Sequence, residues 1–232
     1  MALPKLNSVK YELTLPSTGE KVEYRPFLVK EEKALMIAQQ SGKEADMLRA
    51  VETIIEDCTF GKMKKGDNAF FDIEYVFLQL RAKSVGETVE VQITCPDDET
   101  TKVTKTINLE DVNCVKNVEN VSDIKITDTI GIVMDYPKIN DLALIDSNNT
   151  ETSFDLIESC IKQVYDADSV YEKTDMNKNE LKDFIESMTH DQFIKIQQFF
   201  ETMPRVKHSV KVKNPNTGVE SEVVLEGMAN FF

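Results

Sequence analysis

The sequence predicts an α+β fold in which several β-hairpins are combined with amphipathic helices. Apolar side chains recur at every second residue on both sides of Pro- and Gly-containing turns, which is typical of hairpins. Elsewhere they recur at every third or fourth residue, which is typical of helices that bury one face. With 232 residues, of which 41% are apolar, the chain is long enough to bury a core without disulfides or a structural metal.

Three hairpins are expected, near residues 9–24, 88–109 and 208–225. Their turns combine residues that turns prefer: Pro16-Ser17-Thr18-Gly19, Cys95-Pro96-Asp97-Asp98-Glu99 and Asn214-Pro215-Asn216-Thr217-Gly218. A further strand is expected between Asp123 and Met134, where β-branched residues alternate loosely with polar ones.

Helices are expected over residues 29–41, 44–58 and 71–84, with Gly42 ending the first and Gly86 ending the third. Three more are expected in the C-terminal part of the chain. One begins at Ser153, and one opens at Thr189 with the capping-box spacing to Gln192 and stops before Pro204. The apolar stripes of the first two of these helices are Phe154, Ile157, Ile161 and Val164, and then Leu181, Phe184, Ile185 and Met188.

The polar, turn-rich segment Asp146-Ser147-Asn148-Asn149-Thr150 is the best candidate for a domain boundary. Residues 1–146 are therefore expected to form an N-terminal α+β region with a hairpin, three helices, a central hairpin and a strand. Residues 147–232 are expected to form a C-terminal helical region that ends in a β-hairpin.

The charge balance limits the classes of partner. There are 27 Lys and Arg residues against 41 Asp and Glu, a formal net charge of −14. This argues against nucleic acid or an anionic membrane surface as the main partner and favours a basic protein. No membrane-spanning segment or signal peptide is expected, because no apolar run is long enough. The four scattered cysteines indicate reduced thiols rather than a disulfide framework.

The sequence carries no signature of an enzyme or of a cofactor site. His190 and His208 lie in no known nucleophile motif, and none of the 8 glycines forms a phosphate-binding loop. Close acidic pairs such as Asp166 with Asp168 are expected by composition alone. We therefore expect no catalysis and no cofactor.

One segment partly matches an EF-hand calcium loop. Positions 1, 3, 5, 9 and 12 of such a loop are occupied by Asp175, Asn177, Asn179, Asp183 and Glu186. However, Glu180 stands where the sharp turn needs glycine. We therefore interpret this segment as an amphipathic helix capped by Asn177 or Asn179.

Cys95-Pro96 at a hairpin tip is the way in which zinc ribbons present a ligand. A ribbon needs two such tips with two thiolates each, whereas here Cys95 is the only cysteine at either tip. We therefore expect a C-terminal hairpin that resembles a zinc ribbon without metal.

The chain ends in two phenylalanines, Phe231 and Phe232, which are too apolar for a solvated tail. They are the candidate interaction residues of the sequence. Either they close the protein's own core, which is the favoured interpretation, or they dock into a partner as a buried aromatic anchor.

Several segments together resemble the baseplate hub proteins of T-even-type contractile-tailed bacteriophages. The resemblance follows the chain in order through residues 71–87, the Cys95-Pro96 turn, residues 184–204 and the ending 225–232. Several members of that family carry Cys-Pro-x-Cys at two hairpin tips. This sequence departs from that pattern, since Asp98, Asn214 and Thr217 replace the other three cysteines.

The resemblance implies a structural or assembly component of the tail baseplate hub that is assembled in the host cytoplasm and located in the virion. It implies other baseplate or tail proteins as partners in a multi-subunit assembly, and no enzymatic activity. The alternative is a tail assembly chaperone or binding module that is absent from the finished particle.

Overall fold

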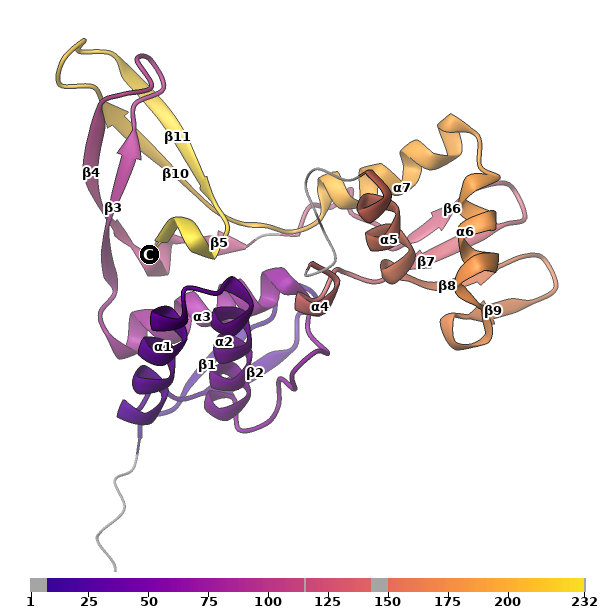
Figure 1. Cartoon of the computed structure of the whole chain (residues 1–232), viewed down its shortest axis with the longest axis horizontal. Coiled ribbons are helices and arrows are strands. Elements are labelled where there is room, and N and C mark those ends of the chain that lie inside the picture. Colours follow the sequence, from indigo (N-terminus) through magenta and orange to yellow (C-terminus); the bar gives the residue numbers. More distant parts are fainter. Residues whose placement is uncertain (1–7, 115, 143–149, 232) are drawn as a thin grey trace, which may run out of the picture. The chain divides into compact units, whose positions relative to one another are not determined.

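The computed structural model describes residues 8–114, 116–142 and 150–231. Contacts divide the chain into two units (Figure 1). The first unit is discontinuous and consists of Met1–Val115 and Pro204–Phe232, whereas the second is Lys116–Met203. In the part of the chain that the structure describes, no helix is both long enough and apolar enough to cross a membrane. The fold is a mixed α+β fold, as the sequence predicts.

This division differs from the boundary expected between residues 146 and 147. That boundary lies in residues 143–149, outside the described residues. The helices on either side of it, α4 (Ile139–Leu142) and α5 (Thr150–Cys160), both belong to the second unit. The C-terminal hairpin belongs to the first unit, where β10 (Val206–Lys213) pairs with β5 (Asn113–Cys114). The polar composition of a segment does not show which distant segments pack together.

The first unit is built around helix α3 (Phe70–Ser84). Helix α1 (Val29–Ser41) packs on α2 (Glu44–Cys58), and α2 packs on α3. The left-handed φ of 66° at Gly42 ends α1, as expected. Helix α3 is buried almost all round, with Phe71, Asp72, Ile73, Glu74, Val76, Phe77, Leu78, Leu80 and Ala82 inside. A helix that is apolar on every side needs cover from several elements.

The three predicted hairpins are confirmed. They are β1 (Tyr11–Thr14) with β2 (Lys21–Tyr24), β3 (Thr88–Thr94) with β4 (Lys102–Asn108), and β10 with β11 (Glu220–Glu226). In β3 the buried residues Val89, Val91 and Ile93 alternate with exposed ones, which is the expected period of two. Strand β10 lies beside β4, so the second and third hairpins are neighbours (Figure 1).

The three hairpins share one turn geometry. Each turn has proline at its second position, and the N–H of its fifth residue donates to the carbonyl of its first. These bonds are 2.8 Å from Gly19 to Leu15, 2.9 Å from Glu99 to Cys95 and 2.9 Å from Gly218 to Asn214. The fifth residue is left-handed in all three, with φ of 72°, 55° and 77°. Glu99 therefore occupies a position that favours glycine.

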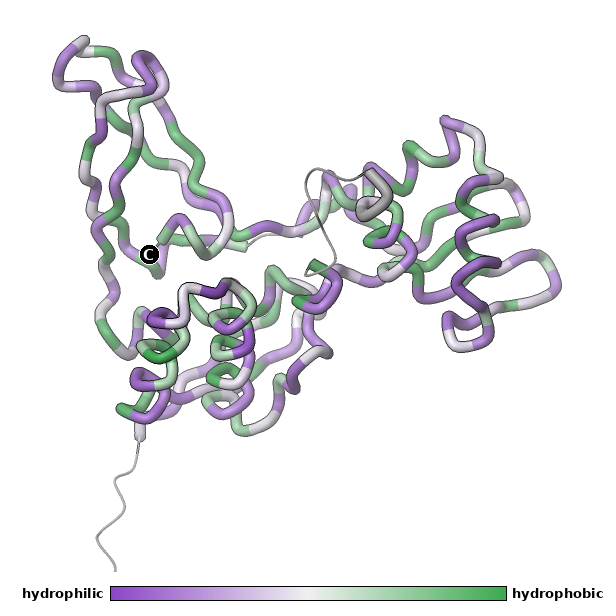
Figure 2. The backbone as a smooth tube through the Cα atoms, in the orientation of Figure 1, coloured by the Kyte–Doolittle hydropathy of each residue, from purple (hydrophilic) through white to green (hydrophobic). Residues whose placement is uncertain are grey.

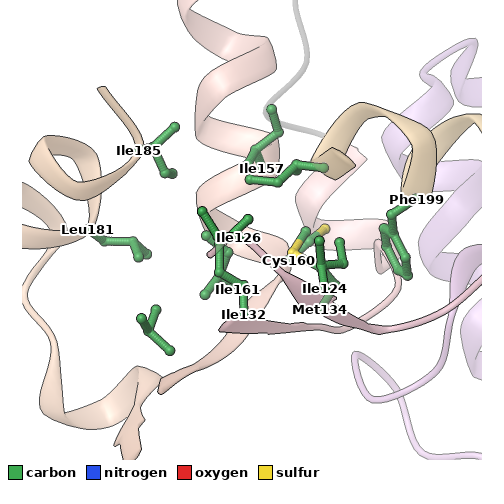
Figure 3. Packing of buried hydrophobic residues seen from close by; sticks show 12 residues of the cluster. Ile124, Ile126, Ile132, Met134, Ile157, Cys160, Ile161, Leu181, Ile185 and Phe199 are labelled. Carbon is green, nitrogen blue, oxygen red and sulfur yellow. The ribbon is translucent and has the colours of Figure 1, made fainter. Parts of the chain in front are cut away.

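The second unit is a four-stranded antiparallel sheet covered by helices. The strands are β6 (Asp123–Lys125), β7 (Gly131–Met134), β8 (Ile161–Tyr165) and β9 (Val170–Glu172), in that order. Helices α5, α6 (Lys178–Glu186) and α7 (His190–Thr202) supply the rest of the core. Figure 3 shows the buried cluster, which includes Ile132, Ile161, Leu181, Ile196 and Phe199.

Two sequence predictions for this unit are wrong. The single strand expected between Asp123 and Met134 is the hairpin β6–β7. The helix expected from Ser153 to Val164 ends at Cys160, and Ile161 and Val164 lie in β8. Met134 pairs with Ile161 whereas Val133 pairs with Gln163, so β8 holds one extra residue at this point. This bulge lets two residues three apart both face the core, which imitates a helical spacing.

The shared turn predicts the effect of placing glycine at residue 99. A non-glycine residue in the left-handed region destabilises the folded chain by about 1 kcal/mol, and glycine removes this strain. The greater freedom of glycine in the unfolded chain offsets part of the resulting gain in stability. We expect Glu99→Gly to raise the free energy of unfolding by about 0.5 kcal/mol. Gly218→Ala is the matched control and should lower it, because its φ of 77° strains any side chain. Urea unfolding measures both, and a loss of stability in Glu99→Gly would contradict the interpretation.

Candidate functional site

Two hairpin tips that are far apart in the sequence form one hydrogen-bonded cluster in the first unit. The Asn214 side-chain amide lies 3.0 Å from both Asp97 carboxylate oxygens and 2.9 Å from Asp98 Oδ2. The Thr217 hydroxyl donates to Asp97. Asn216 Nδ2 donates to Thr101 Oγ1 at 2.9 Å. We call residues 97, 98, 101, 214, 216 and 217 the tip cluster.

Each half of the tip cluster is also fixed within its own turn. Asp98 accepts the backbone N–H of Thr100 at 3.1 Å and of Thr101 at 2.9 Å, together with the Thr101 hydroxyl. Asn214 Oδ1 accepts the N–H of Asn216 at 2.9 Å. Asn214 is only 1% exposed, so its amide group makes its bonds inside the protein. The two turns are thus held rigidly against each other.

Hydrogen-bond donors stabilise the two negative charges of the tip cluster, which lie on Asp97 and Asp98. Hydrogen bonds from the Thr101 hydroxyl and N–H hold the pKa of Asp98 well below its usual range. The hydroxyl of Thr217 and the amide of Asn214 lower the pKa of Asp97. Both carboxylates therefore stay ionised at neutral pH, and neither is poised to transfer a proton.

Cys95 and the other cysteines show no sign of nucleophilic chemistry. All four are free. Burial raises the pKa of the Cys95 thiol, and it raises the pKa of Cys58 to about 11 and of Cys114 and Cys160 to about 12. These thiols are protonated at neutral pH, which removes the reactive thiolate.

The other residues that the sequence singled out are placed apart from the tip cluster or outside any site. His190 is exposed at the start of α7, and His208 Nδ1 lies 3.3 Å from the Asp111 carbonyl. Asn177 caps α6 in a capping box with Glu180, which confirms the helical interpretation of the segment resembling a calcium loop. Asp166 accepts the N–H groups of Asp168 and Ser169 and so stabilises the turn between β8 and β9.

The structure describes only the first of the two terminal phenylalanines. Phe231 lies in the short helix η3 (Met228–Phe231) and is 0% exposed. Helix η3 contacts α3, β3 and β11, so the ring packs inside the first unit. Phe232 lies outside the described residues. Docking through Phe231 would require this ring to leave the core.

Residues 8–232 match a family model described as T4 bacteriophage base plate protein. The chain belongs to this baseplate protein family. The match covers nearly the whole sequence, including both units and both hairpin tips. Comparisons with curated proteins and with solved structures found no match.

Polar groups of this chain join segments that are distant in the sequence, which fits a family of baseplate proteins. In the tip cluster they join two hairpins. On α3, two buried carboxylates that sequence reasoning did not single out as a pair join more distant segments. Asp72 accepts the N–H of Ser17 at 3.0 Å and its hydroxyl, and Glu74 accepts the N–H of Met228 at 2.8 Å. The only signal in the sequence is that these two charges stand inside an apolar run.

The two hairpin tips also carry the four positions at which a zinc ribbon would hold its thiolates. Cys95, Asp98, Asn214 and Thr217 are the first and fourth residues of the two turns, at which relatives implied by the sequence resemblance carry cysteine. Among the residues described here, no three or more His, Cys, Asp and Glu side chains are arranged to hold a metal. The expectation of no bound zinc stays a prediction.

Zinc content tests this interpretation. The natural chain should hold no stoichiometric zinc after dialysis, because a structural zinc needs four ligands. The triple variant Asp98→Cys, Asn214→Cys and Thr217→Cys should bind one zinc per chain, since it completes four thiols on the two turns. Asp98→Cys alone is the control and should bind none. Elemental analysis that finds zinc in the natural chain, or none in the triple variant, would overturn the account.

Truncating Phe231 tests whether the C-terminal ring belongs to the core. We expect Phe231→Ala to lower the free energy of unfolding by about 3–5 kcal/mol, as for other buried aromatic residues. Val224→Ala, at a residue that is 49% exposed, is the control and should change it by less than about 0.5 kcal/mol. Chemical unfolding of both variants gives the comparison. A Phe231→Ala chain with unchanged stability and lost incorporation into tails would instead favour docking.

The Glu74 carboxylate predicts a pH dependence of stability. Burial raises its pKa, so the folded state binds the proton more tightly than the unfolded state, and stability falls as the pH rises through its folded pKa. Glu74→Gln removes the charge and keeps an oxygen to accept from Met228. We expect this variant to be more stable than the natural chain at pH 7.

That difference should shrink as the pH falls toward about 4.3, the ordinary pKa of glutamate. Glu90→Gln changes an exposed residue and is the control. Urea unfolding over this pH range measures the effect. A difference that grows on acidification would contradict it.

Proposed function

We propose that this chain is a structural or assembly component of the central hub of the phage tail baseplate and acts through protein–protein contacts without catalysis. The observation that carries the proposal is the family match over residues 8–232. The assignment to the hub rests on the resemblance of residues 71–87, 184–204 and 225–232 to hub proteins. In this proposal the chain is assembled in the host cytoplasm and remains in the virion.

The distribution of polar groups supports a role without catalysis. The close acidic residues of the tip cluster are bonded within their turn, and Asp166 beside Asp168 accepts backbone N–H groups. An enzyme would require titratable groups that converge on a substrate. The polar side chains described above instead stabilise the fold.

The surface supports protein partners. Val29, Met36 and Ile37 of α1 are 80%, 56% and 58% exposed, and Figure 2 shows hydrophobic positions along this helix among hydrophilic ones. Exposed apolar residues grouped on one element are typical of surfaces that a protein partner covers. The net charge of −14 favours a basic partner and predicts that association weakens as salt is raised.

Mass spectrometry of purified tails tests the proposal. We expect the chain at a fixed copy number relative to the other baseplate proteins, because a structural subunit is retained. Lysate from infected cells is the control for expression. A chain that is abundant in the lysate but absent from finished particles would contradict a structural role and identify an assembly chaperone.

A further inference from the structure

The second unit contains a buried carboxylate that lacks a complete set of partners. Glu158 of α5 is 6% exposed, and its Oε2 atom is buried without a hydrogen-bond partner. Glu158 lines a pocket of about 500 Å³ between α5 and α6. An unpaired charged oxygen in such a place costs free energy unless something neutralises it.

The other buried carboxylates of the described residues are bonded. Glu31 pairs with Arg25 at 2.8 Å. Glu52 accepts the N–H of Gly66 at 3.0 Å. Asp72 and Glu74 accept from Ser17 and Met228. Glu158 is the exception, which points to a group that is supplied from outside this chain.

The lysines of the pocket interact with other carboxylates. Lys178 Nζ lies 2.8 Å from Asp155 Oδ1, and Lys182 Nζ lies 3.8 Å from Glu186 Oε1. Neither forms an ion pair with Glu158 in the structure. Glu158 Oε2 is therefore left without a hydrogen bond. Burial raises the pKa of this carboxyl, although the charges of Lys178 and Lys182 lower it in part.

The remaining walls of the pocket fit a long side chain. Phe154 and Ile185 line it beside the carboxylate, so an aliphatic stem can lie against apolar surface while its charged end reaches Glu158. A guanidinium group is planar, donates two parallel hydrogen bonds to a carboxylate and is more weakly hydrated than an ammonium group. Arginine is accordingly enriched among the residues that anchor protein interfaces.

We propose that the Glu158 pocket receives an arginine side chain of a partner protein in the baseplate. This inference rests on the proposed function, because it names the chemistry of a partner in the assembly. The net charge of −14 attracts a basic partner, and the pocket gives that partner a specific place to bind.

The direct test uses the full chain and N-acetyl-arginine methylamide as the probe. We expect saturable shifts of the Ile185 methyl signals in NMR spectra and a lowered pKa of Glu158 on binding. The citrulline analogue has the same shape without the charge and should bind at least tenfold more weakly. Equal binding of the two probes, or no saturable shift, would overturn the proposal.

Two variants identify the carboxylate that binds. Glu158→Gln keeps the size of the side chain and should weaken binding of the arginine probe at least tenfold. Glu201→Gln changes an exposed carboxylate of the same unit that does not line the pocket and should leave binding within about twofold. Circular dichroism checks that both variants are folded. Unchanged binding in Glu158→Gln would contradict the proposal.

The copy number of each variant in purified tails tests this inference separately from the proposed function. We expect the copy number of Glu158→Gln in purified tails to be lower than that of the natural chain and of Glu201→Gln. Normal incorporation of Glu158→Gln would overturn the arginine pocket but leave the structural role intact. Absence of the natural chain from particles would instead reject the structural role, whatever the probe shows.

Discussion

Burial of α3 on nearly every side is the constraint on which the first unit depends. A fully buried apolar side chain stabilises the fold by roughly 1.5–3 kcal/mol, and α3 buries many of them, among them Val76, Leu78 and Leu80. No single neighbouring element can cover such a helix. Helix α2, the turn of the first hairpin, strand β5 and the returning C-terminal segment together provide the cover. The first unit therefore needs both ends of the chain.

Specific polar bonds fix the segments that cover α3. Asp72 binds the turn of the first hairpin, and Glu74 binds the backbone of η3. The tip cluster joins the second and third hairpins away from the helix. Each bond connects segments that are distant in the sequence. In this baseplate protein, carboxylates with amide and hydroxyl donors therefore hold distant segments of the chain together.

Local patterns in the sequence were enough to predict most elements. Gly42 marks the end of α1, and the spacing from Thr189 to Gln192 marks the start of α7, because both signals act within one helical turn. The strand β8 was predicted as helix because a bulge at Lys162 places Ile161 and Val164 on the same face.

Features that depend on distant parts of the chain were not predictable. The contact between Asp98 and Asn214 joins residues more than one hundred positions apart, and the discontinuous first unit follows from the pairing of β5 with β10. The sequence does identify both hairpin turns of the tip cluster. It does not show that they meet, nor that Glu158 lacks a partner, since burial and pairing are properties of the folded chain.

Hydrogen exchange on a chain that ends at Met203 tests most directly whether the first unit needs its C-terminal return. The account predicts that amides of α2 and α3, such as those of Ile55 and Val76, lose their protection in this truncated chain. Amides of Ile132 and Ile196 in the second unit should keep theirs, because their core lies wholly within residues 116–203. Full protection of Ile55 and Val76 without residues 204–232 would contradict the account.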